Sequence, residues 1–427
     1  MMIVAPLCTS GSCLRSGYTL VPWRIVTLIS AVLLMAGCER APPEPLTFYE
    51  VANPAGEGSA QQRLSVGGGG DVVMSWLEPG TEGHALKYAI MVTDGWSESQ
   101  TVVTGDNLFV NWADTPSVVK ISDNLWAAHW GVYQAESYFA FNAIVALSVD
   151  GSAWREPFLL HQDGTESEHG FVTLFSQEGS VGAVWLDGRN YIVDGEFLYQ
   201  DHNGNVLGTA LHYAQFSSSG NRLKSFELDE IACDCCLPVI AQSSDGFVLA
   251  YRDRSLEERR DIVVRRMSGG NWQDAVLVGA DNWIIEACPI NGPAIAADGD
   301  SVAVAWFSAT NNEPYVRLAL SADAGKSFGE PIEIDADGSF GHVDLVLTDE
   351  GDAIVSWLRS DADRVAITLR RITAEGLVGE AQTVAHIDIG RPADFPQMVK
   401  VGRQLVFAWS DFDGNGKVRT AVAEITP

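Results

Sequence analysis

The sequence predicts an all-β fold, and more narrowly a β-propeller of seven blades. The main observation is a repeated short apolar run that ends in an aromatic residue. Successive aromatic positions lie 54, 55, 66, 55, 51 and 52 residues apart. Units of about fifty residues that carry four short strands are typical of propellers. The seven aromatic positions are Trp76, Trp130, Trp185, Tyr251, Trp306, Trp357 and Trp409.

The strand signals follow the same order in each unit. The apolar run comes after a turn rich in Gly, Asp or Asn, such as SSDG at 243–246, and another apolar strand precedes that turn. An alternating strand such as DIVVRRM at 261–267 and a last strand such as EPIEI at 330–334 then follow. A nearly continuous apolar run is expected for a strand buried between neighbouring blades. Six blades are the alternative count.

The two ends of the predicted domain complement each other. The last unit lacks a fourth strand, and residues 46–52 (LTFYEVA) form a strand-like segment without partners of its own. We expect this segment to pair with the C-terminal unit, because the pairing closes the ring and removes an exposed sheet edge. Residues 46–427 are therefore predicted to form one propeller domain.

The N-terminal residues have the features of an export signal. Arg24 precedes an apolar run from Ile25 to Ala36, which is short for a membrane span. The following LMAGC (34–38) resembles the bacterial lipobox, whose cysteine becomes the lipidated first residue of the mature protein. We expect residues 1–37 to be a lipoprotein signal peptide and residues 38–45 a lipidated linker attached to a membrane through Cys38. The expected location is the bacterial cell envelope, on the periplasmic or outer-membrane side.

The charge balance argues against nucleic acid as a partner. The chain has 27 Lys and Arg residues against 56 Asp and Glu residues, with a net charge of −29. A surface of this sign repels nucleic acid. We expect a monomer without a nucleic-acid partner.

Several stretches resemble the sialidase-like propeller family. Residues 321–328 (SADAGKSF) are similar to its Asp-box, Ser-x-Asp-x-Gly-x-Thr-Trp, and residues 148–154 are a weaker copy. Other stretches are similar to exported bacterial proteins commonly labelled exo-alpha-sialidase. These are EHGF (168–171), WLDGR (185–189), CDCC (233–236), YRDRS (251–255) and CPINGPA (288–294). The resemblance implies a glycan site on one face of the propeller and Asp-boxes between third and fourth strands on the opposite face.

The topology of a propeller gathers the chemically active residues at one rim. The loop before each first strand and the loop after each second strand open on the same face, and ligand sites concentrate on such loops. Ligand-binding candidates on these loops are Trp112, His129, Trp130, His169, Arg252, Asp253 and Asn291.

The family resemblance also implies catalytic candidates. Sialidase-like enzymes hold a sugar carboxylate with three arginines, and they use a tyrosine nucleophile paired with an acid and a separate acidic proton donor. The sequence departs from them because it lacks their Arg-Ile-Pro stretch and because no tyrosine–glutamate pair can be assigned. Taken singly, each arginine is more often a salt-bridge partner of a nearby acid. The candidates are Asp114, Glu168, Asp187, Arg189, Arg254 and Arg391.

Three of the seven cysteines crowd into IACDCCLP (231–238). Export favours disulfides, and the preferred pairs are Cys233 with Cys236 and Cys235 with Cys288, whose loops lead into adjacent blades. A copper or zinc site is the alternative, because Cys233 and Cys236 have Cys-x-x-Cys spacing. Its further ligands would be Cys235, Cys288, His129 and His169.

Three functions follow from these features. The first is an envelope-anchored, sialidase-like propeller that binds and hydrolyses glycans at one face. The second is a propeller that binds a ligand or protein at this face without catalysis. The third is a metal or redox protein that uses the four cysteines. This ranking rests on fold-level analogy, and no cofactor is required by the sequence.

Overall fold

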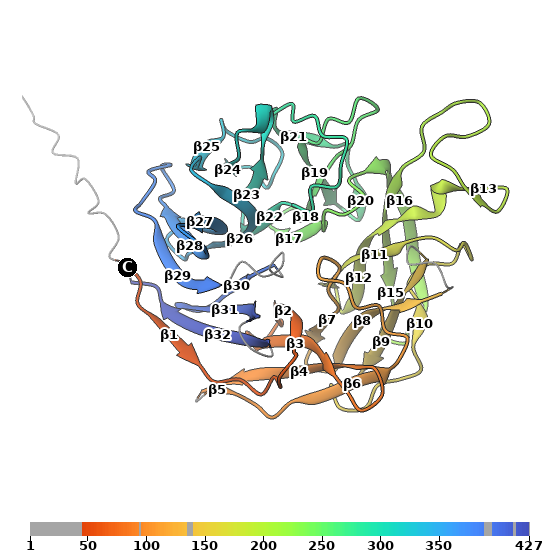
Figure 1. The fold of residues 1–427 in the computed structure, drawn as a ribbon, viewed down its shortest axis with the longest axis horizontal. Coiled ribbons are helices and arrows are strands. Elements are labelled where there is room, and N and C mark those ends of the chain that lie inside the picture. Colours follow the sequence, from red (N-terminus) through yellow and green to blue (C-terminus); the bar gives the residue numbers. More distant parts are fainter. Residues whose placement is uncertain (1–44, 94, 135–139, 388–394, 413–415, 427) are drawn as a thin grey trace, which may run out of the picture. The chain divides into compact units, whose positions relative to one another are not determined.

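Seven antiparallel sheets, one for each predicted repeat, stand side by side in a ring (Figure 1). The computed structural model describes residues 45–93, 95–134, 140–387, 395–412 and 416–426. The fold is the predicted all-β propeller with seven blades, and the alternative of six blades is wrong. The first strands of neighbouring blades contact one another around the centre, so each blade begins at the axis and runs outwards.

The first four blades follow chain order from the N-terminus. Blade one contains β2 (Ala60–Val66), β3 (Val72–Pro79), β4 (His84–Val92), β5 (Gly95–Trp96) and β6 (Gln100–Gly105). Blade two contains β7 (Ser117–Ser122), β8 (Leu125–Tyr133), β9 (Phe141–Ser148) and β10 (Phe158–Leu159). Blade three contains β11 (His169–Gln177), β12 (Ser180–Asp187), β15 (Thr209–Phe216) and β16 (Arg222–Ala232). Blade four contains β17 (Val239–Ser243), β18 (Gly246–Arg252), β19 (Ile262–Ser268), β20 (Asn271–Trp272) and β21 (Val276–Gly279).

The remaining three blades complete the ring. Blade five contains β22 (Ala294–Asp298), β23 (Ser301–Ser308), β24 (Tyr315–Ser321) and β25 (Ile332–Asp335). Blade six contains β26 (Ser339–Leu347), β27 (Ala353–Asp361), β28 (Arg364–Ile372) and β29 (Gln382–Ile387). Blade seven contains β30 (Gln397–Val401), β31 (Gln404–Asp411), β32 (Lys417–Glu424) and β1 (Phe48–Val51).

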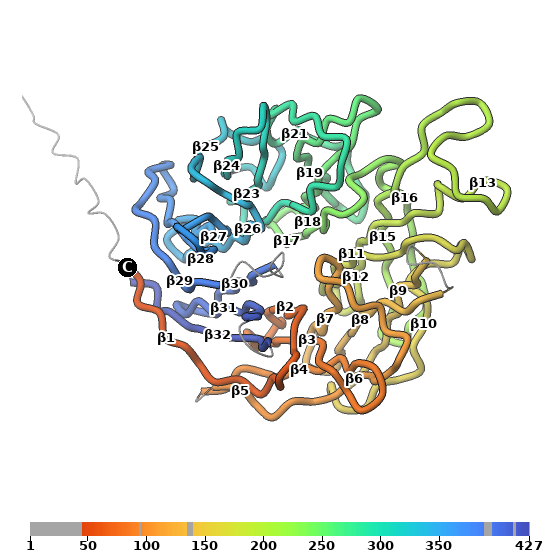
Figure 2. The backbone as a smooth tube through the Cα atoms, in the orientation of Figure 1, coloured from red at the N-terminus to blue at the C-terminus, as the bar shows by residue number. Residues whose placement is uncertain are grey.

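The ring closes between the two ends of the chain, as the sequence predicts. Strand β1 pairs antiparallel with β32 and supplies the fourth strand of blade seven. Figure 2 shows this red segment beside the blue C-terminal segment. The pairing satisfies the backbone groups of β32 that would otherwise form an open edge.

Each aromatic repeat position lies on the second strand of its blade and is buried. Four of the tryptophans also donate their indole N–H to a carboxylate, which satisfies a polar atom inside the apolar layers. The pairs are Trp76 with Glu78 at 2.8 Å, Trp185 with Asp187 at 2.8 Å, Trp306 with Asp281 at 2.6 Å and Trp357 with Asp335 at 2.8 Å. The repeat seen in the sequence therefore marks the packing between blades.

The core is divided into clusters that lie between blades. Seven hydrophobic clusters each combine buried residues from two neighbouring sheets, and together they cover all seven blade junctions. Each central strand is covered on both faces, which explains why its sequence is apolar at nearly every position.

The two Asp-box segments lie where the family resemblance places them. Residues 321–328 connect β24 to β25, and residues 148–154 connect β9 to β10, so both join a third strand to a fourth. In the first turn Asp323 accepts hydrogen bonds from the hydroxyls of Ser321 and Ser327 at 2.7 and 2.6 Å. The Asp-box carboxylates stabilise turns at one end of the strands. A site is therefore expected on the loops at the other ends.

The predicted leader lies outside the described residues, together with Cys38 and Arg391. Among the residues that the structure describes, no helix has the length and apolar character needed to cross a membrane. The lipid anchor and the envelope location stay predictions.

Arg252 ties blade four to blade five. Its side chain is 1% exposed and donates to three backbone carbonyls, those of Asn291 at 2.8 Å, Arg260 at 2.6 Å and Phe307 at 2.7 Å. The guanidinium also lies 5.1 Å from the ring centroid of Trp283. Arg252 was a candidate ligand residue, but the structure places it in the junction between blades.

This arrangement predicts a large stability loss for Arg252→Ala. Three buried carbonyls would lose their donors, so we expect the free energy of unfolding to fall by about 3 kcal/mol or more. Urea denaturation measures the loss. Arg155→Ala is the matched control, because the exposed Arg155 makes one hydrogen bond to Ser218 O at 2.6 Å. Equal losses of unfolding free energy in the two variants would contradict the assignment of Arg252 to the junction between blades.

Candidate functional site

A cavity of about 1100 Å³ lies among the loops of blades two to five. Its walls come from the loops before the first strands of these blades and from the loops after β12 and β18. The predicted rim is therefore where the cavity lies. Among the sequence-based candidates, those that line it are Trp112, Asp114, Glu168, Cys235, Arg254 and Cys288.

The cavity is acidic. Six carboxyl groups and two guanidinium groups line it among the described residues. A cavity with this balance favours neutral or positively charged ligands over anions. The charged residues are Asp114, Glu166, Glu168, Asp234, Glu258, Glu286, Arg254 and Arg260.

Asp234 is the centre of the hydrogen-bond network in the cavity wall. Its Oδ1 atom accepts from the hydroxyl of Tyr191 at 2.8 Å and from that of Thr209 at 2.9 Å. Nη1 of Arg254 donates to Oδ1 and Oδ2 at 3.1 and 3.0 Å and to the Tyr191 oxygen at 3.2 Å. These contacts fix the position of the carboxylate.

Both arginines of the cavity are already neutralised by acids. Nη2 of Arg254 donates to Glu258 Oε1 at 2.7 Å, and Nη2 of Arg260 donates to Glu258 Oε2 at 2.8 Å. Among the described residues, the buried Nε and Nη1 atoms of Arg260 have no hydrogen-bond partner, although Nη1 lies 3.7 Å from Asp234 Oδ2. Neither guanidinium is presented to a ligand carboxylate.

Two acids in the cavity hold their protons near neutral pH. Burial and the negative charges of Asp234 and Asp114 raise the pKa of Glu168 to about 7. Burial also raises the pKa of Asp114 to about 7, although a hydrogen bond from Phe171 N at 2.9 Å and the charge of Arg63 act in the opposite direction. Glu168 is half-buried at the cavity, so it is placed to donate a proton to a bound molecule.

One wall of the cavity is aromatic, and it comes from an insertion in blade three. Residues 188–208 between β12 and β15 form the short helix η1 (Gly188–Tyr191) and a hairpin of β13 (Ile192–Val193) and β14 (Glu196–Phe197) that extends outwards (Figure 1). The rings of Tyr191, Phe197 and Tyr199 contact one another with centroid distances of 4.9 to 5.8 Å. Phe197 and Tyr199 are 49% and 72% exposed, so they offer ring faces to a ligand.

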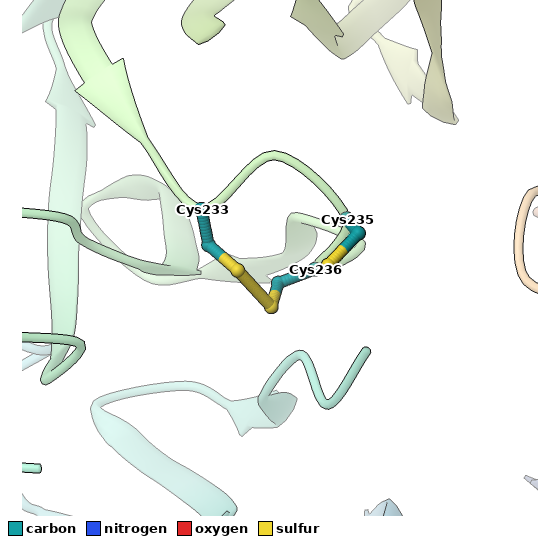
Figure 3. A group of neighbouring side chains, drawn as sticks. All are labelled: Cys233, Cys235 and Cys236. Atoms are coloured by element: carbon teal, nitrogen blue, oxygen red, sulfur yellow. A yellow bond between two sulfur atoms is a disulfide. The ribbon is translucent and has the colours of Figure 1, made fainter. Parts of the chain in front are cut away.

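Two disulfides fix the cysteine loop. Cys233 is joined to Cys236 and Cys235 to Cys288, which are the pairs preferred from the sequence. Figure 3 shows the Cys233–Cys236 bridge, with Cys235 on the same loop. A paired sulfur has no thiolate to offer a metal, so in this form the loop is a covalent staple. Its role is to hold Asp234, which lies inside the bridged segment, against blade three.

Several candidate residues lie in the scaffold and do not line the cavity. The Nδ1 atom of His129 is 3.0 Å from Ser117 Oγ, and Trp130 packs in the cluster between blades one and two. Asn291 accepts from His342 N at 2.7 Å, and Asp253 accepts from the backbone N–H of Arg254 at 2.8 Å. The hydrogen bonds of His129, Asn291 and Asp253 stabilise the scaffold.

The predicted arginine cluster does not form among the described residues. Arg189 donates to Asp187 from Nε at 2.8 Å and from Nη2 at 2.5 Å, and neither residue lines the cavity. His169 is bonded to Asp163, so neither it nor His129 joins the sulfur atoms as the metal alternative requires. The third arginine, Arg391, lies outside the described residues.

Sequence reasoning missed three residues that build the site, namely Tyr191, Asp234 and Glu258. A tyrosine–acid pair is present, but the acid is Asp234, so a search for a tyrosine–glutamate pair overlooks it. One signal was available, because the spacing of 66 residues between Trp185 and Tyr251 exceeds the others and marks the insertion that carries Tyr191.

No family model matches the sequence, and no curated protein matches it. Solved structures match through their fold. The polysaccharide lyase Uly1 has a TM-score of 0.50 and 12% identity, over 88% of this chain and 92% of its own. The alpha-L-arabinanase of Penicillium chrysogenum, solved with arabinobiose, has a TM-score of 0.48 and 13% identity, over 89% and 99%. A mutant NanB sialidase from Streptococcus pneumoniae has a TM-score of 0.43 and 9% identity, over 90% and 98%.

These comparisons establish a distant structural similarity to sialidase and other glycosidase propellers. At 9 to 13% identity these similarities concern the fold alone. At identities this low, chemistry has to be argued from the site itself.

The raised pKa of Asp114 predicts a stability change with pH. Between its ordinary value of 3.8 and about 7, the folded chain holds a proton that the unfolded chain has released, so stability falls as the pH rises through this window. Asp114→Asn keeps an oxygen for the Phe171 N–H and has no proton to lose. Urea denaturation should show the variant more stable than wild type by about 2–4 kcal/mol at pH 8 and nearly equal at pH 4. If the stabilities of wild type and Asp114→Asn change in parallel with pH, this result would contradict the raised pKa of Asp114.

Proposed function

We propose that this propeller binds neutral glycans in the cavity of blades two to five and hydrolyses them. The observation that carries the proposal is that one cavity combines Glu168, whose pKa is raised to about 7, the hydrogen-bonded carboxylate of Asp234 and exposed aromatic rings. Sugar rings stack on aromatic faces, and glycoside hydrolysis needs one acid that gives a proton and one carboxylate that stays charged.

The two carboxyl groups have different environments, which assigns them different roles. Glu168 lies among negative charges and keeps its proton near pH 7, so it protonates the oxygen of the leaving sugar. Asp234 is held in place by hydrogen bonds from Tyr191, Thr209 and Arg254, so its carboxylate is positioned to stabilise the positive charge that develops on the sugar ring. Tyr191 acts as a positioning residue for this carboxylate.

The charges of the cavity favour neutral sugars over sialic or uronic acids. An anionic sugar needs a free guanidinium, and both cavity arginines are engaged by Asp234 and Glu258. The same argument disfavours elimination at a uronic acid, because that reaction also requires neutralisation of the sugar carboxylate.

The role of Glu168 is tested with two kinds of substrate. Glu168→Gln should lower turnover of neutral oligosaccharides by about 100-fold or more, because their leaving group must be protonated. The turnover of 4-methylumbelliferyl glycosides of the same sugars should fall much less, because the leaving group of these substrates departs without a proton. Wild-type turnover of the oligosaccharides should fall above pH 7 as Glu168 loses its proton.

The matched control is Glu166→Gln, because Glu166 lines the same cavity and is exposed. It should leave the rate and the pH profile nearly unchanged. Equal loss on both substrate types would refute the proton-donor role. Glycan binding by wild type without any turnover would instead support the non-catalytic alternative.

A further inference from the structure

The insertion of blade three begins beside the two acids of the cavity. Its first residue, Gly188, donates its N–H to the carbonyl oxygen of Glu168 at 2.7 Å. Three residues later, the hydroxyl of Tyr191 donates to Asp234 at 2.8 Å. The rest of the insertion leads away from these two contacts, and Figure 1 shows its β13–β14 hairpin extending outwards from the blade. A ligand that starts at the acids and continues along the insertion therefore reaches the hairpin.

The three rings of the insertion are increasingly exposed along the chain. Tyr191 is 7% exposed, Phe197 49% and Tyr199 72%. The ring of Tyr191 stacks on that of Phe197 with centroids 4.9 Å apart and an interplanar angle of 23°. Tyr199 meets both rings edge-on at centroid distances of 5.8 and 5.2 Å. The row thus begins at the contact with Asp234 and ends at a ring that is largely open to solvent.

Backbone hydrogen bonds hold the hairpin in this position. Leu198 N donates to Tyr191 O at 2.8 Å, and Leu207 N donates to Tyr199 O at 2.9 Å. The turn at 201–205 is closed by two backbone N–H groups that donate to the carboxylate of its first residue at 2.8 Å. A tyrosine on such a backbone has few torsions to fix, so it loses little conformational entropy when a ligand covers it.

The packing of the propeller does not account for the exposed rings. Among the described strands, β13 and β14 pair only with each other, so the hairpin extends no blade. The seven clusters between blades contain none of the three rings among the described residues. Exposed apolar side chains that gather at a polar cavity are typical of ligand-binding grooves.

We infer that Phe197 and Tyr199 form a distal sugar subsite, so that the preferred ligand of the cavity is a neutral oligosaccharide chain and not a single sugar or a disaccharide. One sugar of the chain lies between Glu168 and Asp234, and a later sugar packs on the ring of Tyr199. This inference rests on the proposed glycan binding, and it adds the length of the ligand and the residues that recognise it.

The size and chemistry of the cavity agree with a chain of sugars. Its volume of about 1100 Å³ exceeds the usual range for a pocket that holds one small molecule. A sugar ring has a face of C–H groups, which packs on the negative face of an aromatic ring, while its hydroxyl groups stay in water. An aromatic subsite recognises no charge, so it suits the neutral sugars that the engaged arginines favour.

A series of chain lengths tests the distal subsite by kinetics. The probes are cello-, xylo- and arabino-oligosaccharides of two to six sugars. For the series that wild type hydrolyses, kcat/KM should rise from the disaccharide to the longer chains. Tyr199→Ala should raise KM for the longer chains by about tenfold and leave kcat and the disaccharide nearly unchanged, because the ring contacts a sugar remote from the bond that breaks.

Tyr199→Phe is the matched control, because it keeps the ring face and removes only the hydroxyl. It should retain the dependence of wild type on chain length. Tyr199 is mostly exposed, so neither substitution should lower Tm. A wild type whose kcat/KM is the same for all chain lengths would overturn the inference, and so would an equal rise of KM for short and long chains in Tyr199→Ala.

Calorimetry with Glu168→Gln separates the distal subsite from catalysis. A tetrasaccharide should bind this variant about tenfold more tightly than the disaccharide, and adding Tyr199→Ala should remove the difference. This dependence in a wild-type chain that hydrolyses no glycan would support the subsite and contradict hydrolysis. Hydrolysis without any dependence on chain length would overturn the subsite alone, and binding of none of the three series would also overturn it.

Discussion

The closed ring of blade-to-blade contacts is the constraint on which the rest of the molecule depends. Each sheet buries both faces against its neighbours, so no blade has a complete core of its own. The ring becomes continuous only when β1 adds to β32 in blade seven. Among the described residues, closure fixes the relative positions of the loops that precede first strands or follow second strands, and the cavity is built from some of these loops.

The cavity shows how a rigid ring positions chemistry. Tyr191 comes from blade three, Asp234 from the loop before blade four and Arg254 from the loop after β18, yet their side-chain atoms meet within hydrogen-bond distance. The Cys235–Cys288 bridge ties the Asp234 loop to the loop before blade five. The position of Asp234 therefore depends on two disulfides and on contacts from neighbouring blades.

The fold could be predicted largely from the sequence because its signals are local. A buried second strand imposes an apolar run with an aromatic end, and ring closure follows from one unpaired segment at each end. The rule for loops also indicated the correct face, which is why Trp112, Glu168 and Arg254 were found.

The orientation of individual side chains could not be predicted in the same way. Arg252 and Arg254 are two residues apart, but Arg252 turns into the blade junction and Arg254 into the cavity. Similarly, Glu168 lines the cavity, whereas the buried side chain of the adjacent His169 is bonded to Asp163. Arg254 lies after the end of β18 and Glu168 before the start of β11, so their orientation depends on loop contacts that the sequence does not state.

The most direct test of the account is calorimetric titration of the chain, carrying Glu168→Gln to prevent turnover, with neutral and anionic oligosaccharides. Xylotetraose, arabinotetraose and cellotetraose serve as neutral probes, and sialyllactose and tetragalacturonate as anionic probes. The acidic cavity and its engaged arginines predict binding of a neutral probe and none of the anionic ones. Preferential binding of sialyllactose or tetragalacturonate would contradict the account, because it would require a free cationic group in this cavity.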